Sequence, residues 1–348
     1  MNELLKNYTP KTNPGKNKGQ GVNHSLKAFC EGLKKRKNFL LASHVNPEGD
    51  AVGSLIAMQS ILQRLGKKTT IVCEDSFPER LHCLRYKGEW NIYQESKDKK
   101  LKFDALVVAD CPTLERIGKV RSLLQSDTAI FNIDHHISNT RFGLYNYVKP
   151  EAAACGEVIY EIIKQLKLSI NQEEARALYV SLTTDTGSFK YSNTTIRTHR
   201  IAAELIRTGI DIDRINEELY ATYSLNKIQL YSRLLSKVQT AFGGKVAWVA
   251  MNRSDLKASG ATYEDTEGFI DFLKYLKEVK VAFFLSEMER DNEVKVSFRS
   301  KEHYDVNQIA TAFGGGGHKK ASGCTIHLPL SEAVDAILKE IQKQLQFK

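Results

Sequence analysis

Long apolar runs and paired cysteines are both missing from this sequence. No stretch approaches the roughly 20 apolar residues that a membrane-spanning helix needs, which argues against a membrane protein. The N-terminal segment MNELLKNYTPKTNPGKNKGQG has no continuous apolar core, so it is not expected to act as a secretory signal. The 6 cysteines are scattered and form no CxxC pair, as is typical of free thiols in a reducing compartment. We therefore expect a cytoplasmic protein.

The net positive charge is low along most of the chain, although the total is +9. Residues 1–37 carry nine Lys and Arg against two Glu, a net of +7, which leaves only +2 for the remaining residues. A long nucleic-acid groove would need a basic stripe along the folded body. We interpret residues 1–23 as a disordered, solubilising tail, and weak attraction to RNA or a membrane surface is the alternative.

The chain length of 348 residues predicts two domains. Short apolar runs alternate with helical patterns after Lys37, which is typical of an α/β domain with a mainly parallel, doubly wound sheet covered on both faces. We expect strands at 39–43, 69–73, 105–109 and 129–133, and helices at 51–65, 156–168, 172–184 and 196–208. This first domain is assigned to 24–210, and a wholly helical linker to 211–238.

The remaining segment, 239–348, is predicted to form a smaller α/β domain with a mixed sheet. Its expected strands are 245–250, 279–288 and 293–299, and its expected helices are 267–276, 305–312 and 331–345. A run of glycines separates the last two helices.

Polar side chains gather where the expected strands of the first domain end, which is the edge where doubly wound sheets bind ligands. They are His44, Glu48 and Asp50, then Asp110, then Asp134, His135 and His136, and finally Asp185 at the end of a helix. Any one of them alone is a common turn or cap residue. Carboxylates crowded into one layer beside imidazoles repel one another unless a cation neutralises them.

Six of these residues are candidate metal ligands: His44, Glu48, Asp50, Asp110, His135 and Asp185. Imidazole and carboxylate donors suit Mn²⁺, Mg²⁺, Co²⁺ or Zn²⁺, and no thiolate is present to favour zinc. The number of ligands predicts two ions rather than one. Such a pair can bridge a water, lower its pKa and hold the attacking and leaving oxygens of a phosphoryl group.

Four motifs, VNPEGDAVGS, VVADCP, IDHHIS and LTTDTGSF, resemble those of the DHH phosphoesterase family and occur in the family's order. The later segment VSFRS…DVNQIATAFGGGGHKKASG resembles the DHH-associated C-terminal domain. The resemblance covers about residues 38–345. It is strongest to the NrnA type, which comprises oligoribonucleases that also dephosphorylate 3′-phosphoadenosine 5′-phosphate. Relatives with the same domain pair act on cyclic di-AMP or its linear product.

The resemblance implies a role for each residue of the metal site. His44, Glu48 and Asp110 would hold one ion, and Asp50, Asp110, His135 and Asp185 the other, with Asp110 as the bridge. His136 would face the substrate phosphate, and Asp134 would orient the histidines. Manganese is the expected ion, and magnesium or cobalt are alternatives. The family usually has Asp where this chain has Glu48, which predicts an altered metal preference or a weaker first site.

The glycine run predicts a phosphate or base contact in the second domain. Gly314, Gly315, Gly316 and Gly317 lack Cβ atoms, so their backbone N–H groups can approach a ligand closely, and a flexible turn is the alternative. The resemblance implies that Arg299, Asn307 and His318 grip the substrate's terminal phosphate or nucleotide across a cleft from the metals. A surface ion pair is the alternative role of Arg299.

The sequence therefore predicts a metal-dependent phosphoesterase that hydrolyses short oligoribonucleotides and 3′,5′-bisphosphonucleotides by in-line attack of a metal-bridged hydroxide. A cyclic-dinucleotide phosphodiesterase is the first alternative. A pyrophosphatase or exopolyphosphatase and a non-catalytic nucleotide-binding sensor are the others. The expected partner is a short RNA or nucleotide, with no membrane, and the sequence leaves open whether the chain forms a homodimer.

Overall fold

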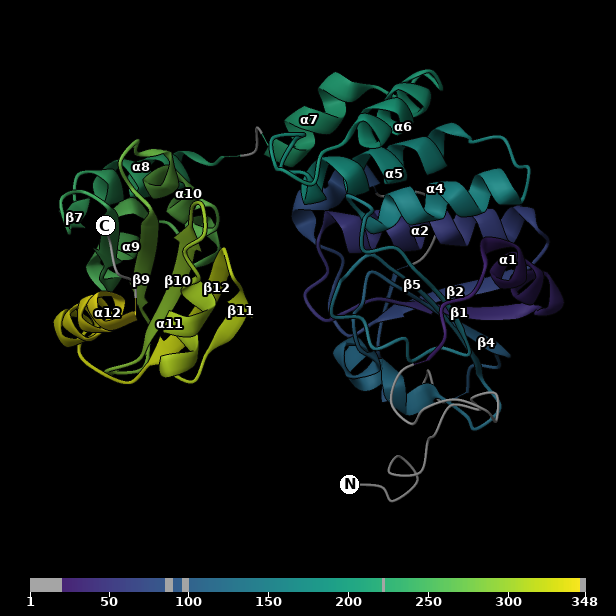
Figure 1. Cartoon of the computed structure of the whole chain (residues 1–348), viewed down its shortest axis with the longest axis horizontal. Coiled ribbons are helices and arrows are strands. Elements are labelled where there is room, and N and C mark those ends of the chain that lie inside the picture. The colour runs from purple at the N-terminus through teal and green to yellow at the C-terminus, as the bar shows by residue number, and fades with distance from the viewer. Residues whose placement is uncertain (1–20, 85–89, 96–99, 221–222, 345–348) are drawn as a thin grey trace. The chain divides into compact units, whose positions relative to one another are not determined.

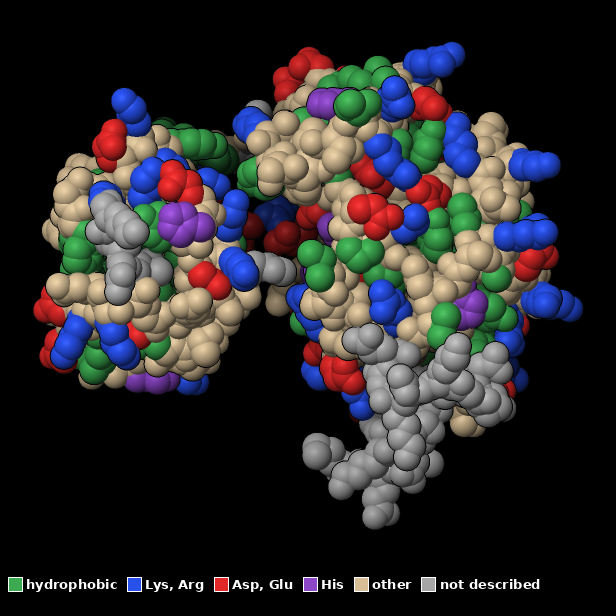
Figure 2. Space-filling view, in the orientation of Figure 1, with side chains coloured by type: hydrophobic (Ala, Val, Ile, Leu, Met, Phe, Trp, Pro, Cys, Tyr) green, Lys and Arg blue, Asp and Glu red, His purple; other side chains and the backbone are tan. Residues whose placement is uncertain are grey.

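The computed structural model describes residues 21–84, 90–95, 100–220 and 223–344. The chain divides into two compact units, 1–222 and 223–348 (Figure 1). Each unit contains its own sheet and its own apolar core, so each is described by itself. Basic and acidic side chains intermingle on the drawn face of the first unit (Figure 2).

The first unit contains a six-stranded sheet in the order β3-β2-β1-β4-β5-β6, and every neighbouring pair is parallel. The strands are β1 (Asn38–Ala42), β2 (Lys68–Cys73), β3 (Trp90–Ile92), β4 (Ala105–Ala109), β5 (Ala129–Asp134) and β6 (Tyr145–Val148). The expected parallel α/β sheet is thus confirmed, and the short edge strands β3 and β6 extend it. The strand order reverses between β1 and β4, which opens a crevice at their carboxyl ends.

Helices and two 3₁₀ segments cover the two faces of this sheet. The elements are α1 (Leu26–Lys35), α2 (Gly49–Arg64), η2 (Glu79–Leu84), η3 (Leu114–Leu123), α4 (Cys155–Gln165), α5 (Gln172–Asp185), α6 (Ile196–Ile206) and α7 (Ile212–Tyr220). Alternate strand residues point to opposite faces. Phe39 and Leu41 join the core formed with α2, α4 and α5, whereas Leu40 and Ala42 join the core formed with η3.

Three helices on one face, α2, α4 and α5, pack unusually closely (Figure 1). A Cβ at Gly53 of α2 would lie 2.3 Å from the Ala177 carbonyl oxygen of α5. A Cβ at Gly156 of α4 would lie 2.1 Å from the Ser181 hydroxyl oxygen of α5. Glycine is therefore required at both positions, and the close packing brings the ends of these helices together beside the sheet.

The second unit is built on a mixed sheet, as expected, in the order β11-β12-β10-β9-β8-β7. Its strands are β7 (Gln239–Ala241), β8 (Val246–Met251), β9 (Val281–Glu287), β10 (Val294–Ser300), β11 (Gly316–His318) and β12 (Ala321–Ile326). Only the pair β8 and β9 is parallel among these described strands.

Both faces of this second sheet carry helices. One face packs against α8 (Leu225–Leu235), α9 (Arg253–Ser259) and α10 (Phe269–Tyr275), with η4 (Glu264–Thr266) nearby. The other packs against α11 (Val306–Ala312) and α12 (Leu330–Gln344). Within the described part of the chain, no helix has the length and apolar character that crossing a membrane requires.

The segments 1–23 and 211–238, expected to be a disordered tail and a helical linker, differ from these expectations where the structure describes them. Residues 1–20 lie outside the described residues, but the Asn23 side chain exchanges two hydrogen bonds with the backbone of Val148. The segment 211–238 is not one continuous helix. Its first part is α7 of the first unit, and Ser224 caps a new helix, α8, by accepting a hydrogen bond from the Lys227 N–H.

Candidate metal centre

The carboxyl ends of neighbouring strands deliver the first residues of the site. His44 comes two residues after β1, Asp110 directly follows β4, and His135 directly follows β5. Asp110 adopts a left-handed backbone conformation with φ of 54°, which costs energy for most side chains but is tolerated by Asp. The Asp110 N–H still donates to the Ile133 carbonyl, so the turn keeps its place on the sheet.

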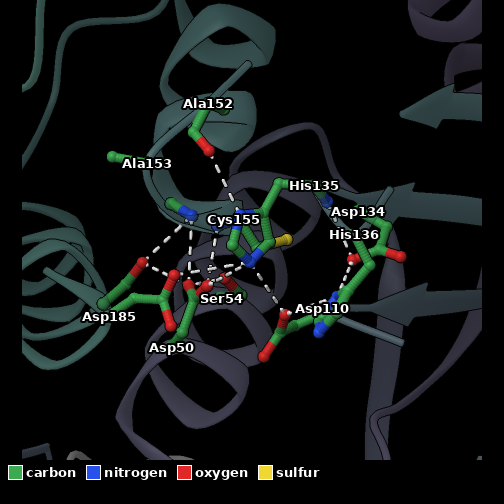
Figure 3. A network of polar contacts seen from close by, with 12 residues as sticks. Asp50, Ser54, Asp110, Asp134, His135, His136, Ala152, Ala153, Cys155 and Asp185 are labelled. Carbon is green, nitrogen blue, oxygen red and sulfur yellow. Dashed lines mark hydrogen bonds and ion pairs between the residues drawn. The ribbon is translucent and has the colours of Figure 1, made fainter. Parts of the chain in front are cut away.

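Four side chains from separate parts of the chain converge on one point (Figure 3). The Nε2 atom of His135 lies 3.5 Å from Asp50 Oδ2, 3.6 Å from Asp110 Oδ1 and 3.5 Å from Asp185 Oδ2. Asp50 is in the first turn of α2, and Asp185 is the last residue of α5. The expected convergence of Asp50, Asp110, His135 and Asp185 is therefore present.

The spacing of these atoms fits a shared divalent ion better than direct hydrogen bonding. Donor and acceptor atoms 3.5–3.6 Å apart are too distant for a normal hydrogen bond. Ligand atoms about 2.0–2.2 Å from one ion lie roughly 3.0–3.6 Å from one another. Asp110 Oδ1 is moreover buried without a hydrogen-bond partner. An unpaired buried carboxylate oxygen is costly, and a cation removes that cost.

Protein donors hold Asp50 in a single orientation. Its Oδ1 atom accepts hydrogen bonds from the Ser181 hydroxyl at 2.5 Å, the Gly156 N–H at 3.2 Å and the Ser54 hydroxyl at 3.3 Å. Its Oδ2 atom accepts only the Cys155 N–H, at 2.7 Å, and is the oxygen that faces His135. Two of these donors are the first N–H groups of α4, where a helix favours negative charge.

Backbone carbonyls orient the two histidines that face Asp110. His135 Nδ1 lies 3.2 Å from the Ala152 carbonyl oxygen, and His44 Nδ1 lies 2.8 Å from the Val45 carbonyl oxygen. If each Nδ1 donates its proton there, the Nε2 lone pair is free for an ion, which is a common arrangement in metal sites. His44 Nε2 lies 3.7 Å from Asp110 Oδ2, the second oxygen of that carboxylate.

Asp134 and His136 form a pair beside this cluster. His136 Nδ1 lies 2.7 Å from Asp134 Oδ1 and 3.6 Å from Asp110 Oδ1. Asp134 is fully buried, and its oxygens also accept from the His135 N–H and from the Asn139 side-chain amide. Both oxygens of Asp134 are therefore occupied by protein donors, which suits an orienting group.

Proximity of charges shifts the pKa values of the cluster strongly. Burial raises the pKa of Asp185 to about 6, with Asp110 and Glu48 adding to the effect and His135 opposing it. Burial, Asp110 and Asp185 also hold the pKa of Asp50 well above its usual range.

The histidines of the cluster respond in the opposite sense. Burial opposes protonation of His135, but Asp110, Asp50 and Asp185 outweigh it and raise its pKa to about 10. The pKa values of His44 and His136 are also raised, because Asp110 and Asp134 respectively outweigh their burial. Burial likewise opposes ionisation of Asp110, yet His135 and His44 keep its pKa well below its usual range. Without a bound cation, this cluster therefore retains protons at neutral pH.

Glu48 lies at the edge of the cluster rather than inside it. It is the N-cap residue of α2 and is exposed, and it makes no capping hydrogen bond. Among the described residues, there are two groups in which each residue offers one ligand atom and all these atoms lie within 4.8 Å of one another. One group is Asp50, His135 and Asp185, and the other is Asp110, Asp134, His135 and His136. Neither group contains Glu48 or His44.

The residues expected to bind substrate lie on β10, β11 and α11 of the second unit. Arg299 of β10 pairs with Ala321 of β12, which pairs in turn with His318 of β11, so the three lie on one line across the sheet. The Arg299 Nε atom lies 3.7 Å from Asp271 Oδ1. The Oδ1 atom of Asn307, on α11, is buried without a hydrogen-bond partner. The His318 side chain lies outside the part of the chain that the structure describes.

The glycine run passes from a turn at Gly314 into the short strand β11. Gly316 and Gly317 belong to β11 and pair with Gly323 and Ser322 of β12. A Cβ at Gly315 would lie 2.2 Å from the Gly323 carbonyl oxygen, and Gly317 has a φ of 144°. Gly314 and Gly316 are exposed, and a Cβ on Gly316 would meet only the Asn307 Oδ1 atom, at 3.9 Å. The glycines thus serve close strand packing and leave bare backbone next to Asn307.

Sequence reasoning missed the residues that position the metal ligands. Ser54 lies one helical turn after Asp50 in α2, whereas Ser181 reaches Asp50 from α5, so sequence spacing alone does not single out either serine. Asn193 gave no signal either. Its side-chain amide donates to the carbonyl oxygens of Ala153 and Asp185. Asn193 therefore links the segment of Ala152, whose carbonyl faces His135, to the end of the helix that carries Asp185.

Two family models match the chain. The model described as "DHH family, N-terminal domain" matches residues 38–182, and the model described as "DHHA1 domain" matches residues 243–346. The first contains the candidate metal ligands up to His135, and the second contains Arg299, Asn307 and the glycine run.

Curated relatives match over nearly the whole chain. A Thermus thermophilus protein named bifunctional oligoribonuclease and PAP phosphatase NrnA is 31% identical over 306 residues, which is 88% of this chain and 89% of the relative. A Bacillus subtilis protein of the same name is 28% identical over 87% of this chain and 93% of the relative. A crystal structure titled as an exopolyphosphatase-related protein from Bacteroides fragilis has a TM-score of 0.86 and 27% identity, and covers 91% of this chain and 95% of its own.

The pH dependence of metal binding follows from the raised pKa values. His135, with a pKa of about 10 in the metal-free protein, must lose its proton to bind an ion, so affinity should rise at least about tenfold per pH unit between pH 6 and 8. Below pH 6 the slope should steepen, because Asp185, with a pKa of about 6, gains a competing proton. Titration calorimetry with Mn²⁺ on EDTA-treated protein measures the slope, and a flat profile from pH 6 to 8 would contradict it.

Removal of the Ser181 hydroxyl should weaken metal binding. Ser181→Ala deletes the shortest hydrogen bond to Asp50, so we expect Mn²⁺ affinity to fall about tenfold, the low end for residues that orient metal ligands. Ser54→Ala removes a longer bond to the same oxygen and should have a smaller effect. Calorimetry on both variants tests this order, and equal affinities of Ser181→Ala and the unmodified protein would refute the orienting role.

Proposed function

Because this chain belongs to the DHH family of phosphoesterases, we propose that it hydrolyses short oligoribonucleotides and the 3′-phosphate of 3′,5′-bisphosphonucleotides. Two relatives that match over most of their length are named bifunctional oligoribonuclease and PAP phosphatase. The support from this chain itself is the convergence of Asp50, Asp110, His135 and Asp185 around an unpaired carboxylate oxygen. That arrangement suits a divalent-cation site of a hydrolase.

The donor set is suited to two ions, with manganese proposed and magnesium or cobalt as alternatives. Asp110 directs Oδ1 towards His135 and Oδ2 towards His44, so it can serve as a shared ligand. We assign Asp50, Asp110, His135 and Asp185 to one ion, and His44, Glu48 and Asp110 to the other. Bound ions would lower the pKa of a nucleophilic water and neutralise phosphoryl oxygens.

His136 is the residue that we propose to face the substrate. Its Nδ1 atom is engaged by Asp134, which leaves Nε2 as the atom that can reach a phosphate or leaving oxygen. Asp134 raises the pKa of His136, which favours a protonated ring able to neutralise charge or donate a proton. Asp134 in turn is fixed by Asn139 and the His135 N–H, so the ring orientation is set by a buried network.

The second unit supplies the proposed nucleotide contacts. Arg299 can form a forked contact with phosphate oxygens, and the exposed backbone of the glycine strand offers N–H groups beside the unpaired Asn307 Oδ1. Beyond residues 1–37 the chain carries a net charge of only +2, so few phosphate contacts are available. A binding site with few phosphate contacts favours short substrates over long strands.

A substrate panel tests the proposal. Mn²⁺-loaded protein should hydrolyse a 5′-phosphorylated diadenylate and pentaadenylate and release phosphate from 3′-phosphoadenosine 5′-phosphate. Cyclic di-AMP and pyrophosphate are the decisive comparisons, the latter because one similar structure is titled exopolyphosphatase-related. Asp110→Asn should lower every rate at least about a thousandfold, because both ions lose a ligand. Turnover of pyrophosphate alone, or nucleotide binding without turnover, would refute the proposal.

Arg299→Ala should raise KM while leaving kcat nearly unchanged, if the arginine contacts the phosphate equally in the ground and transition states. A charge-assisted hydrogen bond contributes about 1.5–3 kcal/mol, so KM should rise roughly tenfold to a hundredfold. Arg290→Ala is the matched control, because Arg290 is almost fully exposed in the same unit. Steady-state kinetics with diadenylate provides the measurement, and an unchanged KM would exclude phosphate binding by Arg299.

A further inference from the structure

An exposed aromatic residue, Tyr275, ends the helix of the second unit that contacts Arg299. Its side chain is 70% exposed at the end of α10, although aromatic side chains are usually buried for their apolar area. Its ring contacts that of Phe272, at 6.4 Å between centroids and nearly perpendicular. Phe272 in turn packs against Tyr231, so Tyr275 is the outermost ring of an aromatic row rooted in the core.

Helical spacing connects Tyr275 to Arg299. Asp271 is four residues before Tyr275, so the two share one face of α10 about 6 Å apart along its axis. The Asp271 carboxylate lies 3.7 Å from Arg299 Nε and 3.5 Å from Lys274 Nζ. The helix α10 packs against β9 and also against β10, which carries Arg299. Tyr275 is therefore about one helical turn along α10 from the residue that contacts Arg299, and this relation lies within one unit.

Cationic side chains gather near the C-terminal end of α10. Lys301 Nζ donates to the Leu276 carbonyl oxygen at 2.7 Å, so this ammonium is held next to Tyr275. Burial, together with the neighbouring Lys280 and Lys274, lowers the pKa of Lys301, which shows that positive charges are crowded here. The local set of Lys274, Lys277, Lys280, Arg299 and Lys301 exceeds the acidic set of Asp271, Glu278 and Glu302 by two charges. The patch is thus aromatic and net positive.

We propose that Tyr275 stacks on a base of the RNA substrate, one nucleotide or more beyond the terminal nucleotide held by Arg299, while Lys274 and Lys301 contact the intervening phosphates. This inference rests on the proposed function and extends it to substrate length. Exposed aromatic rings interleaved with cations form sequence-tolerant platforms for single-stranded nucleic acid. The positive charge distinguishes this occupant from an apolar protein surface, for which charges at the centre are unfavourable.

The platform predicts a preference for substrates longer than one nucleotide. A single bisphosphonucleotide has no further base to stack, whereas pentaadenylate does. Stacking on an aromatic side chain is worth about 1–3 kcal/mol per base, which corresponds to roughly 5- to 150-fold in affinity. The ratio of kcat/KM for pentaadenylate to kcat/KM for 3′-phosphoadenosine 5′-phosphate isolates this effect from changes in the metal site.

Tyr275→Ala should lower that ratio at least about fivefold, and Tyr275→Trp should preserve it because the ring is retained. Lys274→Ala should lower it less, because one exposed phosphate contact is lost. Lys295→Ala is the matched control and should leave the ratio unchanged, since Lys295 is exposed on the same strand as Arg299 but about 13 Å away along it. An unchanged ratio in Tyr275→Ala overturns the inference, even if all RNA substrates are still hydrolysed.

A failure of the proposed function gives a different result. If the unmodified protein cleaves neither substrate, fluorescence anisotropy with 3′-labelled pentaadenylate decides the matter. Weaker binding by Tyr275→Ala than by the unmodified protein then supports the platform, and equal or absent binding in both overturns it. If Tyr275→Ala instead changes the oligomeric state relative to the unmodified protein, as measured by sedimentation, and leaves the ratio of kcat/KM values unchanged, the patch binds a second copy of the chain and the inference is wrong.

Discussion

Mutual repulsion among three aspartates, two of them buried and one half-buried, is the constraint on which the rest of the site depends. Asp50, Asp110 and Asp185 all face His135 Nε2, and His135 can neutralise at most one of them. Two like charges about 4 Å apart repel by roughly 4 kcal/mol at the effective dielectric of a protein surface. Raised pKa values for Asp50 and Asp185 express this repulsion. A divalent cation converts the same arrangement from unfavourable to favourable, which makes ion binding and local stability one process.

The fold keeps these charges together because their positions are set by well-packed backbone. Asp50 cannot withdraw, since four donors from α2, α4 and α5 hold it, and Gly53 and Gly156 let those helices approach closely. Asp110 occupies a left-handed turn anchored to β5. The cost of assembling the carboxylates is offset by the large apolar cores on both faces of the sheet, which relaxation of the site would disrupt.

The sequence predicted the convergence because parallel strands all end at one edge. Apolar runs such as 105–109 and 129–133 located the central strands, and the polar residues after them had to meet. The edge strands β3 and β6, WNI and YNYV, were missed because they are short and alternate with Asn. The break at 223–224 was missed because the flanking residues are good helix formers, and only Ser224 signals a new start.

Positioning groups were harder to predict than ligands. A serine four residues from an aspartate is common in helices, so Ser54 and Ser181 carry no signal until the packing of α2 against α5 is known. The sequence interpretation assigned the glycine run to ligand contact through bare backbone. In the structure, two of the four glycines are instead required by close packing against a neighbouring strand. Gly315 and Gly317 are needed for contact with β12, which depends on a strand that composition did not predict.

The two proposed ion positions are unequal in a way that bears on Glu48. The set around His135 contains three carboxylates within 3.6 Å of one nitrogen, so it is preorganised. The other set has His44 at 3.7 Å from Asp110, while Glu48 is exposed at the start of α2 and has no hydrogen bond to fix it. An exposed side chain loses rotamer freedom when it binds an ion, and the loss lowers affinity. The ion near His44 would therefore bind more weakly and exchange faster than the ion near His135.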